Sequence, residues 1–370
     1  MRLLHTADWH LGKSLKGQNL IEDQKHILDE IFKVIDDQQP DSILIAGDIY
    51  DRAVPPVEAV ELFNETLNRL AEKKLPTLII AGNHDSATRL NFGSKLFEQQ
   101  GIFIASKIKD QPAQVILNDE FGEVYFSMIP YFEPGEIRAK FFDEDTPRPT
   151  YNDANKFYVD LARKNIPHNK RSVAIAHVFL TGGIESESER KFVGGAENVS
   201  AQIFSDYNYV ALGHLHSPQR FYAGSPLKYS FDESKQKKSV AIADIDASGK
   251  VEVKRIPLTP RHDVRVVKGT LAELRKLPRT EDYICAQLTE RVINVQDKLS
   301  WNFPNLLNVE FHLPQASSTD ATEKISRETF STLDYFADFF NVQTGEPLND
   351  DYRFAMKEFF ISLEHEERGV

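Results

Sequence analysis

Cysteine is almost absent from this chain, since Cys285 is the single thiol among 370 residues. One cysteine excludes an internal disulfide and any metal cluster that needs several thiolate ligands from the same chain. We therefore expect a protein of the reducing cytoplasm, and any metal ion that it binds should be held by oxygen and nitrogen atoms.

Long apolar segments are missing as well. The N-terminus, residues 1–8, has no apolar core of signal-peptide length, and no later run approaches the length that crosses a bilayer. We therefore expect no targeting to a membrane.

Positive charge is in deficit, because 44 Lys and Arg residues face 56 Asp and Glu residues and give a formal net charge of −12. This balance argues against a protein that coats nucleic acid through bulk positive charge. It does not exclude a nuclease, since an enzyme can contact phosphate through bound cations and a few local basic residues.

What is present is the composition of a globular protein. Hydrophobic residues make up 41% and charged residues 27% of the chain, which suits about two or three domains. Residues 257–261 and 314–318 lack apolar periodicity and contain proline or serine, so they are predicted as linkers. The chain should therefore have three parts, residues 1–260, 264–314 and 321–370.

The first hundred residues alternate between short apolar runs and stretches of helical periodicity, which predicts a mainly parallel sheet. The predicted strands are residues 2–6, 42–47, 77–81 and 101–105, and the predicted helices are residues 20–38, 55–74 and 89–99.

Later residues show a more mixed pattern. Residues 220–222, 239–245 and 251–257 alternate between polar and apolar side chains, so we predict that they form a second, antiparallel sheet with a hairpin turn at 246–249. Residues 131–149 are predicted to be irregular. The remaining predicted elements are strands at 115–117, 123–130, 172–176, 209–213, 283–288 and 308–313, and helices at 152–164 and 270–277.

Side chains that can bind metal ions follow five of the predicted strands. In open α/β sheets, ligands bind at the carboxyl ends of the strands. Any one of these side chains could be an ordinary turn residue or a structural histidine, but their coincidence at five strand ends favours an active site. Residues two apart also leave an extended chain on the same side. The set is Asp8, His10, Asp48, Asn83, His84, His177, His214 and His216.

These donors are too many for one tetrahedral ion. Two ions that share a carboxylate would use them and leave positions open for water and phosphate. Carboxylate, amide and imidazole ligands suit manganese, iron or zinc, and their spacing does not choose among the three. Hydrolysis of a phosphate ester is the chemistry that such a site performs best.

The order of these motifs, Asp-x-His, Gly-Asp, Gly-Asn-His-Asp, His and Gly-His-x-His, resembles that of the calcineurin-like metallophosphoesterases. Longer segments at residues 5–12, 46–51, 209–216 and 224–231 are similar to nucleases of the Mre family. The resemblance implies an α/β fold in which two mixed β-sheets form a sandwich flanked by helices, with a small α+β cap and a C-terminal helical segment.

The resemblance also implies the metal ligands, for two divalent ions that we expect to be Mn²⁺. One ion would be held by Asp8, His10, Asp48 and His216, and the other by Asp48, Asn83, His177 and His214. Asp48 would bridge the two ions.

The catalytic residues implied by the resemblance are His84 and Asp85. His84 would approach the phosphate, to stabilise the transition state or protonate the leaving oxygen, and Asp85 would orient it. Relatives often have a histidine where this chain has Asp51, so a second phosphate-facing imidazole is not expected, and Asp51 is either structural or a support for the ligands.

The family further implies a DNA nuclease that acts on duplex ends as an exonuclease and on single strands or hairpins as an endonuclease. Its partner would be an ATPase bound by residues 321–370, and a homodimer would form through residues 56–70 and 89–97.

Several alternatives stay open. The cap would either shape a DNA-binding cleft or be a structural addition only. The Phe-rich tail could be a helical hairpin with its own core. A phosphodiesterase or phosphatase for nucleotides or phosphoproteins, and a scaffold without metals, are the alternatives.

Overall fold

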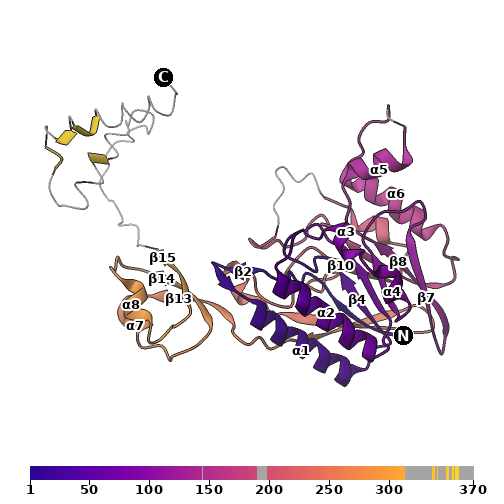
Figure 1. The fold of residues 1–370 in the computed structure, drawn as a ribbon, viewed down its shortest axis with the longest axis horizontal. Helices are drawn as coiled ribbons and strands as arrows, with labels where there is room; N and C mark the ends of the chain where they lie inside the picture. Colours follow the sequence, from indigo (N-terminus) through magenta and orange to yellow (C-terminus); the bar gives the residue numbers. More distant parts are fainter. Residues whose placement is uncertain are drawn as a thin grey trace. The chain divides into compact units, whose positions relative to one another are not determined.

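The computed structural model describes residues 1–143, 145–189 and 198–312, together with residues 336, 337, 340, 347–349, 352, 353 and 355–357 in the C-terminal part. The chain divides into two compact units, Met1–Leu313 and Pro314–Val370. Every helix and strand given below belongs to the first unit (Figure 1). Most of the predicted tail, residues 321–370, and the predicted linker at 314–318 lie outside the described residues.

The larger of two packed sheets has six strands in the order β12-β11-β1-β4-β5-β6. Strands β1, β4, β5 and β6 run parallel to one another. In contrast, β11 is antiparallel to β1, and β12 is antiparallel to β11. β1, β4 and β5 are almost wholly buried, as expected for parallel strands that are covered on both faces. The strands are β1 (Arg2–Thr6), β4 (Ser42–Ala46), β5 (Thr77–Ile80), β6 (Ile102–Ala105), β11 (Ser239–Ile245) and β12 (Val251–Pro257).

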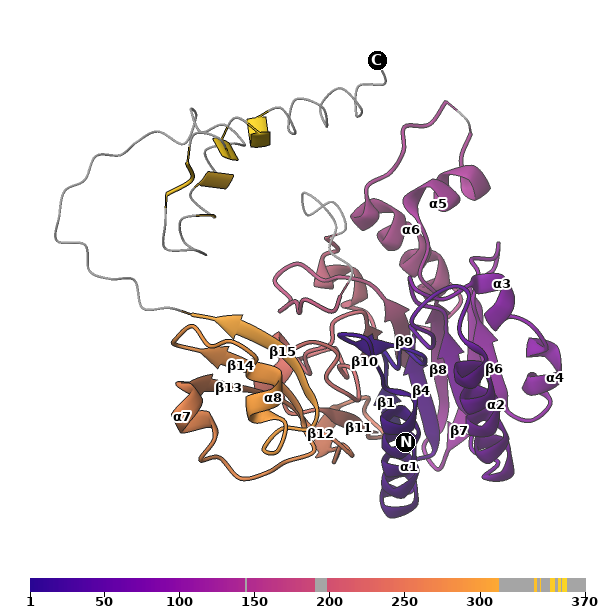
Figure 2. The same ribbon diagram turned by 60° about the vertical axis from the view of Figure 1, so that its left-hand side comes forward.

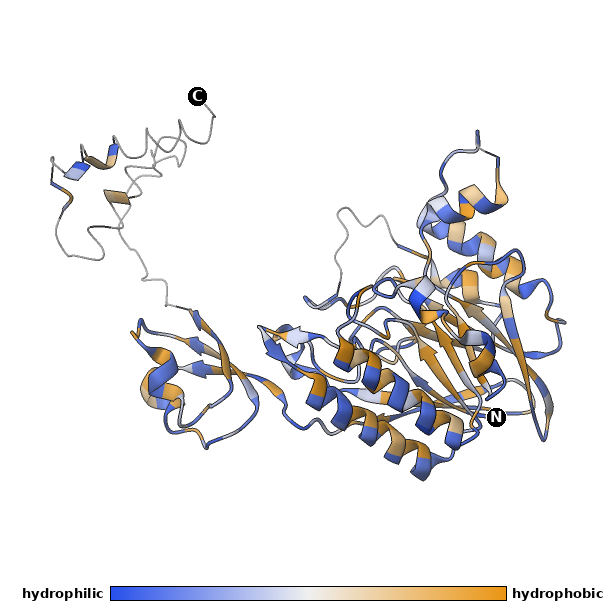
Figure 3. Ribbon diagram, viewed as in Figure 1, coloured by the Kyte–Doolittle hydropathy of each residue, from blue (hydrophilic) through white to orange (hydrophobic). Residues whose placement is uncertain are grey.

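Two long helices, α1 (Ile21–Gln38) and α2 (Val57–Glu72), cover the outer face of this sheet and confirm the predicted helices there. Figure 3 shows their apolar sides turned toward the strands and their polar sides turned away. The single helix predicted at 89–99 is wrong. The chain forms α3 (Ala87–Leu90) and α4 (Ser94–Glu98), because Gly93 between them adopts a left-handed φ of 74° that no α-helix can continue.

The second sheet has four strands in the order β10-β9-β8-β7. Helices α5 (Pro134–Phe141) and α6 (Tyr151–Arg163) lie on its outer side (Figure 2). The prediction of irregular chain up to residue 149 missed α5, which a reciprocal capping box between Glu133 and Glu136 begins. The strands are β7 (Ala113–Asp119), β8 (Gly122–Ile129), β9 (Arg171–His177) and β10 (Tyr209–Gly213).

The main core lies between the two sheets, where Leu44 and Leu78 of the larger sheet belong to one buried cluster with Phe126 and Ile175 of the smaller. Each such side chain contributes about 1.5–3 kcal/mol when it is fully buried. The resulting order of layers, helices, sheet, sheet and helices, is the predicted α/β sandwich of two mixed sheets.

The composition of the second sheet was predicted wrongly. β11 and β12 extend the larger sheet beyond β1, where they cover an edge that would otherwise leave a row of unpaired backbone groups. Residues 220–222 form only isolated bridges through Tyr222. The hairpin turn at 246–249 is confirmed, with Gly249 at φ 84°.

The cap, defined here as residues 264–312, is a parallel three-stranded sheet in the order β13-β14-β15, with α7 and α8. It has its own buried cluster, which includes Ile284 and Phe303. The helix predicted at 270–277 is shorter than expected, and α8 was not predicted. The cap elements are β13 (Val264–Gly269), α7 (Leu271–Leu274), β14 (Tyr283–Leu288), α8 (Val295–Leu299) and β15 (Leu306–Phe311).

Short elements complete the first unit. They are the hairpin β2 (Ser14–Leu15) and β3 (Gln18–Asn19) and the 3₁₀ turns η1 (Ala201–Phe204) and η2 (Asp232–Lys235). Among the described residues, no helix has both the length and the apolar character needed to span a bilayer. Whether residues 1–260 and the cap are separate domains stays a prediction.

Candidate metal centre

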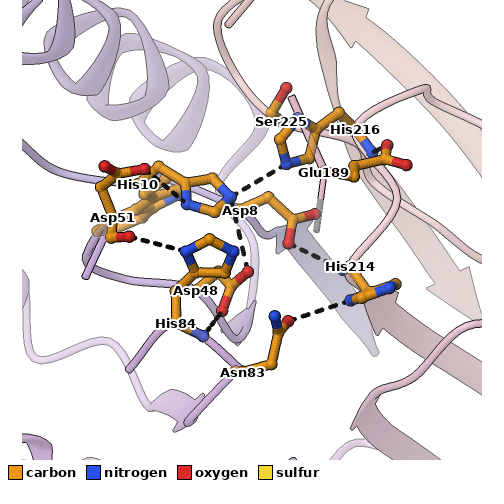
Figure 4. A network of polar contacts seen from close by, with 12 residues as sticks. Asp8, His10, Asp48, Asp51, Asn83, His84, Glu189, His214, His216 and Ser225 are labelled. Atoms are coloured by element: carbon orange, nitrogen blue, oxygen red, sulfur yellow. Dashed lines mark hydrogen bonds and ion pairs between the residues drawn. The ribbon is translucent and has the colours of Figure 1, made fainter. Parts of the chain in front are cut away.

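The predicted site residues lie together at the carboxyl ends of strands from both sheets (Figure 4). Asp8 and His10 follow β1, Asp48 follows β4, and Asn83 follows β5. On the other sheet, His177 ends β9, and His214 and His216 follow β10. Because the two sheets pack face to face, these strand ends meet at one rim of the sandwich. The structure thus brings together residues that are up to 208 positions apart, from Asp8 to His216.

The backbone at four of these residues is strained. Asp8, His10, Asp48 and His214 have φ values of 55°, 44°, 51° and 106°, a region that costs non-glycine residues of the order of 1–3 kcal/mol each. The expectation that Asp8 and His10 leave an extended chain on the same side is therefore wrong. Left-handed turns, not strand geometry, aim these side chains into the site.

Two glycines, Gly47 and Gly82, allow the side chains of site residues to pack directly against the backbone. A Cβ atom on Gly82 would lie 2.1 Å from Oδ1 of Asp48, and one on Gly47 would lie 2.3 Å from Nδ1 of His177. Any side chain at either position would push a site residue out of place.

Asp48 occupies the centre of the site. Its Oδ2 atom lies 3.6 Å from Nε2 of His10 and 3.4 Å from Nε2 of His177. Two groups of side chains could each hold a metal ion, namely His10 with His84 and Asp8 with His177, and Asp48 belongs to both groups. Burial opposes ionisation of this carboxyl, but His177 and His10 hold its pKa well below the usual range.

The imidazoles of His177 and His214 turn a ring nitrogen toward the centre of the site. Nδ1 of His177 donates a hydrogen bond to the carbonyl oxygen of Ala46 (2.9 Å), so its Nε2 atom faces Oδ1 of Asn83 at 2.9 Å. Nδ1 of His214 lies 3.1 Å from the same oxygen. These contacts group Asn83, His177 and His214, the residues predicted with Asp48 to hold one ion.

The other predicted group centres on His10 and His216, whose Nε2 atoms face each other 3.0 Å apart. Burial lowers the pKa of both imidazoles. It also lowers the pKa of His214 to about 3. Neutral imidazoles are the form that binds metal ions, so burial prepares these side chains as ligands.

The surroundings of the Asp8 carboxylate indicate whether the site fits a cation. It is fully buried, its Oδ1 atom accepts from the backbone N–H of His214 (2.8 Å), and its Oδ2 atom has no hydrogen-bond partner. Burial, with Asp48 nearby, raises the pKa of this carboxyl well above its usual value. A buried carboxylate oxygen without a partner is strongly unfavourable unless a cation neutralises it. The residues therefore fit divalent ions that prefer oxygen and nitrogen ligands.

His84 borders this cluster and is only half-buried. Its Nδ1 atom donates to the backbone carbonyl of Asp51 (2.7 Å), and its backbone N–H donates to Oδ1 of Asp48 (2.9 Å). The proton on Nδ1 is thereby fixed, and Nε2 is the ring atom that can exchange a proton or donate to a ligand.

Asp85 has different partners from those expected. Its carboxylate accepts backbone hydrogen bonds from Ile49 (3.1 Å), Tyr50 (3.0 Å) and Gly82 (2.9 Å), so it ties the loop after β4 to the loop after β5. Burial raises the pKa of Asp85 to about 6 in spite of these bonds. The orientation of His84 instead comes from the carbonyl of Asp51.

Further side chains surround the ligands, and only Asp51 among them was named from the sequence. Gln24 on α1 donates to the carbonyl of His10 (2.7 Å), and Asp51 contacts both Lys13 (2.6 Å) and, at 3.6 Å, Nδ1 of His10. Ser188, Glu189, Glu233 and Lys238 surround His216. Apart from Asp51, these residues lie on a helix or in segments outside the quoted motifs, so no signal in the single sequence could have found them.

Comparisons with known proteins identify the family of the chain. Residues 1–218 match the model of the calcineurin-like phosphoesterase family. The chain is 33% identical over 378 residues to the D subunit of nuclease SbcCD from Staphylococcus saprophyticus, covering 98% of both chains. It is 36% identical to the protein of the same name from Staphylococcus epidermidis, covering 83% of this chain and 84% of that one.

Among solved structures, TT1561 of Thermus thermophilus matches with a TM-score of 0.38 and 13% identity, over 69% of this chain and 98% of that chain. The candidate ligands, from Asp8 to His216, all lie within the residues that match the family model.

Proposed function

The chain belongs to the calcineurin-like phosphoesterase family and to its SbcD nucleases, and from this membership we propose that it is the two-metal nuclease subunit of an SbcCD-type complex. The chain is accordingly a metal-dependent hydrolase that acts on phosphodiester bonds. The proposed reactions are exonuclease cleavage at duplex ends and endonuclease cleavage of single strands or hairpins, in DNA end processing, recombination and repair.

The position of Asp48 carries the two-metal assignment. It lies between imidazoles of both ligand groups, and a carboxylate in that position could be shared by two ions. The proposed ligands of one ion are Asp8, His10, Asp48 and His216, and those of the other are Asp48, Asn83, His177 and His214. The side chains of Asp8 and His177 also approach each other, at 3.9 Å, so the two groups are contiguous.

Divalent ions bound there, which we expect to be Mn²⁺, would activate water and neutralise phosphoryl oxygens. The chain itself supplies the proton donor. His84 keeps its Nδ1–H on the carbonyl of Asp51, so in the imidazolium form its second proton, on Nε2, can be donated to a phosphate oxygen or to the leaving oxygen. Asp85 holds the loop that carries His84 against the loop that carries Asp48.

DNA is favoured over a small nucleotide by the charge of the cap. Its seven Lys and Arg residues are all exposed and outnumber its six Asp and Glu residues, although the chain as a whole carries a charge of −12. The net charge of the cap is thus only +1, but exposed Lys and Arg side chains can contact a phosphate backbone individually. The basic residues are Arg265, Lys268, Arg275, Lys276, Arg279, Arg291 and Lys298.

The proposed assembly is a homodimer within a heterotetramer that includes an SbcC-type ATPase. Exposed apolar side chains on and near α2 and α4 support the homodimer, since exposed apolar surface is typical of interfaces. They are Val54, Val57, Val60, Phe92 and Leu96, which are 44–85% exposed. The ATPase would bind residues 321–370.

The decisive experiment incubates the purified chain with end-labelled duplex DNA, with and without Mn²⁺. Manganese-dependent shortening of the labelled strand, absent in an Asp48→Asn variant, would support the nuclease. Hydrolysis of a small phosphodiester but not of DNA would favour the nucleotide phosphodiesterase. A chain that neither binds manganese nor cleaves either substrate would favour the scaffold.

A further inference from the structure

His216 is held from the side that faces away from His10 by three side chains that no motif includes. Its Nδ1 atom lies 2.6 Å from Oγ of Ser188 and 3.4 Å from a carboxylate oxygen of Glu233. The Ser188 hydroxyl also contacts that same oxygen of Glu233, and Lys238 is hydrogen-bonded to the other one at 2.5 Å. Glu233 is fully buried, and Lys238 is 7% exposed.

We propose that Ser188, Glu233 and Lys238 fix the tautomer of His216, so that its Nε2 lone pair faces the metal centre. This inference rests on the proposed function, because it assumes that His216 is a metal ligand. Ser188, Glu233 and Lys238 are then positioning residues, since they act on the metal only through His216.

The available protons determine which group donates and which accepts in each of these hydrogen bonds. The ammonium group of Lys238 keeps Glu233 ionised, and a carboxylate can only accept. The single hydroxyl proton of Ser188 is therefore donated to Glu233, and Oγ is left as an acceptor. Nδ1 of His216 must then carry the ring proton and donate it to Ser188, which leaves the lone pair on Nε2.

The ammonium group of Lys238 is held in place by several further hydrogen bonds. Besides Glu233, its Nζ atom contacts the carbonyl oxygen of His216 (2.8 Å), Oγ of Ser225 (2.8 Å) and Oε1 of Gln236 (2.7 Å). The same ammonium thus holds both the backbone of the ligand and the carboxylate behind its ring. A buried, fully hydrogen-bonded lysine is a rigid support for a ligand.

The backbone of His216 is fixed independently. Its N–H group donates to Oε1 of Glu189 (2.5 Å), while the other oxygen of Glu189 accepts from the backbone of Ser186 (2.9 Å). Main-chain position and ring tautomer are therefore set by different carboxylates. Loss of Ser188 should change the tautomer and leave the fold in place.

The first test measures the tautomer itself in the metal-free chain labelled with ¹⁵N-histidine. The ring nitrogen shifts of His216, assigned with a His216→Gln variant, should show the proton on Nδ1 in the wild type. Ser188→Ala should shift the ring toward a mixture of tautomers, and Ser188→Thr, which keeps the hydroxyl, should restore Nδ1–H. A wild-type ring protonated on Nε2 would overturn the inference without touching the proposed function.

The second test titrates Mn²⁺ into each variant by calorimetry. Ser188→Ala should weaken one of two manganese sites by about 10–100-fold and leave the other unchanged, as is typical when the partner of a ligand histidine is lost. Ser200→Ala, at an exposed cap of η1, is the matched control and should bind as the wild type does. Wild-type manganese affinities at both sites of Ser188→Ala would contradict the inference.

A third variant guards against misfolding. Glu233→Gln alone leaves Lys238 buried without its counter-ion and keeps an acceptor for Ser188, so the double variant Glu233→Met/Lys238→Met removes both charges and that acceptor together. It should keep the wild-type circular dichroism spectrum and lose affinity at the same single manganese site. Two undiminished sites in this variant would also overturn the inference, whereas a wild-type chain that binds no manganese would contradict the proposed function.

Discussion

Oδ2 of Asp48 lies 3.4 Å from Nε2 of His177, although Asp48 follows β4 of the larger sheet and His177 ends β9 of the smaller. The site therefore exists only when the two sheets are packed together. Burial by itself would lower the pKa of His177, but the Asp48 carboxylate raises it to about 9, which reflects how much negative charge this rim concentrates.

Replacement of Asp48 by asparagine should abolish hydrolysis and weaken both metal ions, because a bridging carboxylate supplies charge to each and no neighbour replaces it. Manganese calorimetry and a DNA cleavage assay would measure the two effects. Asp36→Asn, which removes an exposed carboxylate on α1, is the matched control. Two undiminished manganese sites in Asp48→Asn would refute the bridging assignment.

Replacement of His84 by glutamine should leave both ions bound and slow cleavage about a hundredfold or more, the range expected for loss of a general acid or a transition-state contact. The same two assays separate these effects. If metal content fell together with activity, His84 would be a ligand, as its proximity to His10 and Asp48 would then explain.

A methyl group on Gly82 should disrupt the centre, because its Cβ atom would lie 2.1 Å from Oδ1 and 2.4 Å from the backbone nitrogen of Asp48. We expect Gly82→Ala to lower the free energy of unfolding by about 1–3 kcal/mol and to reduce manganese affinity. Gly135→Ala on α5, where a Cβ atom meets nothing within 4 Å and alanine favours the helix, should lower neither quantity. Urea unfolding and calorimetry provide the measurements.

The stability of the smaller sheet should depend on pH through Asp119. Its carboxylate accepts two hydrogen bonds from Arg171 (2.5 and 2.8 Å), and this partner holds its pKa well below the ordinary value. A lowered pKa in the folded state stabilises the protein above the ordinary carboxyl pKa of about 3.9, and this contribution is lost as the pH falls below that value.

We therefore expect Asp119→Asn to lower the free energy of unfolding by about 3 kcal/mol at pH 7 and by less at pH 3. Urea unfolding at the two pH values measures the difference. An equal loss at both would show that the charge of Asp119 is not what stabilises the sheet.

Deletion of residues 321–370 should leave the metal centre and weak manganese-dependent nuclease activity intact, since every candidate ligand lies in the unit Met1–Leu313. The deletion should abolish co-purification with an SbcC-type ATPase and any stimulation by ATP. A complex that survives the deletion would place the ATPase contact elsewhere.

Much of this protein could be predicted from the sequence because the relevant signals are local. Apolar runs such as residues 42–46 mark parallel strands wherever they occur, and the polar residues that follow them, such as Asp48, must lie at the carboxyl end of the sheet. The fold class and the set of residues that converge on one rim follow from these signals and from the order of the motifs.

The tertiary structure decided what depends on contacts between distant segments. β11 joined β1 because that strand had an open edge, a fact that no periodicity within residues 239–245 contains. The positive φ angles of Asp8 and His10 depend on the buried surroundings that hold them. Ser188, Glu233 and Lys238 meet around His216 because burial of a charge requires a partner, and only the folded chain determines which residues can reach it.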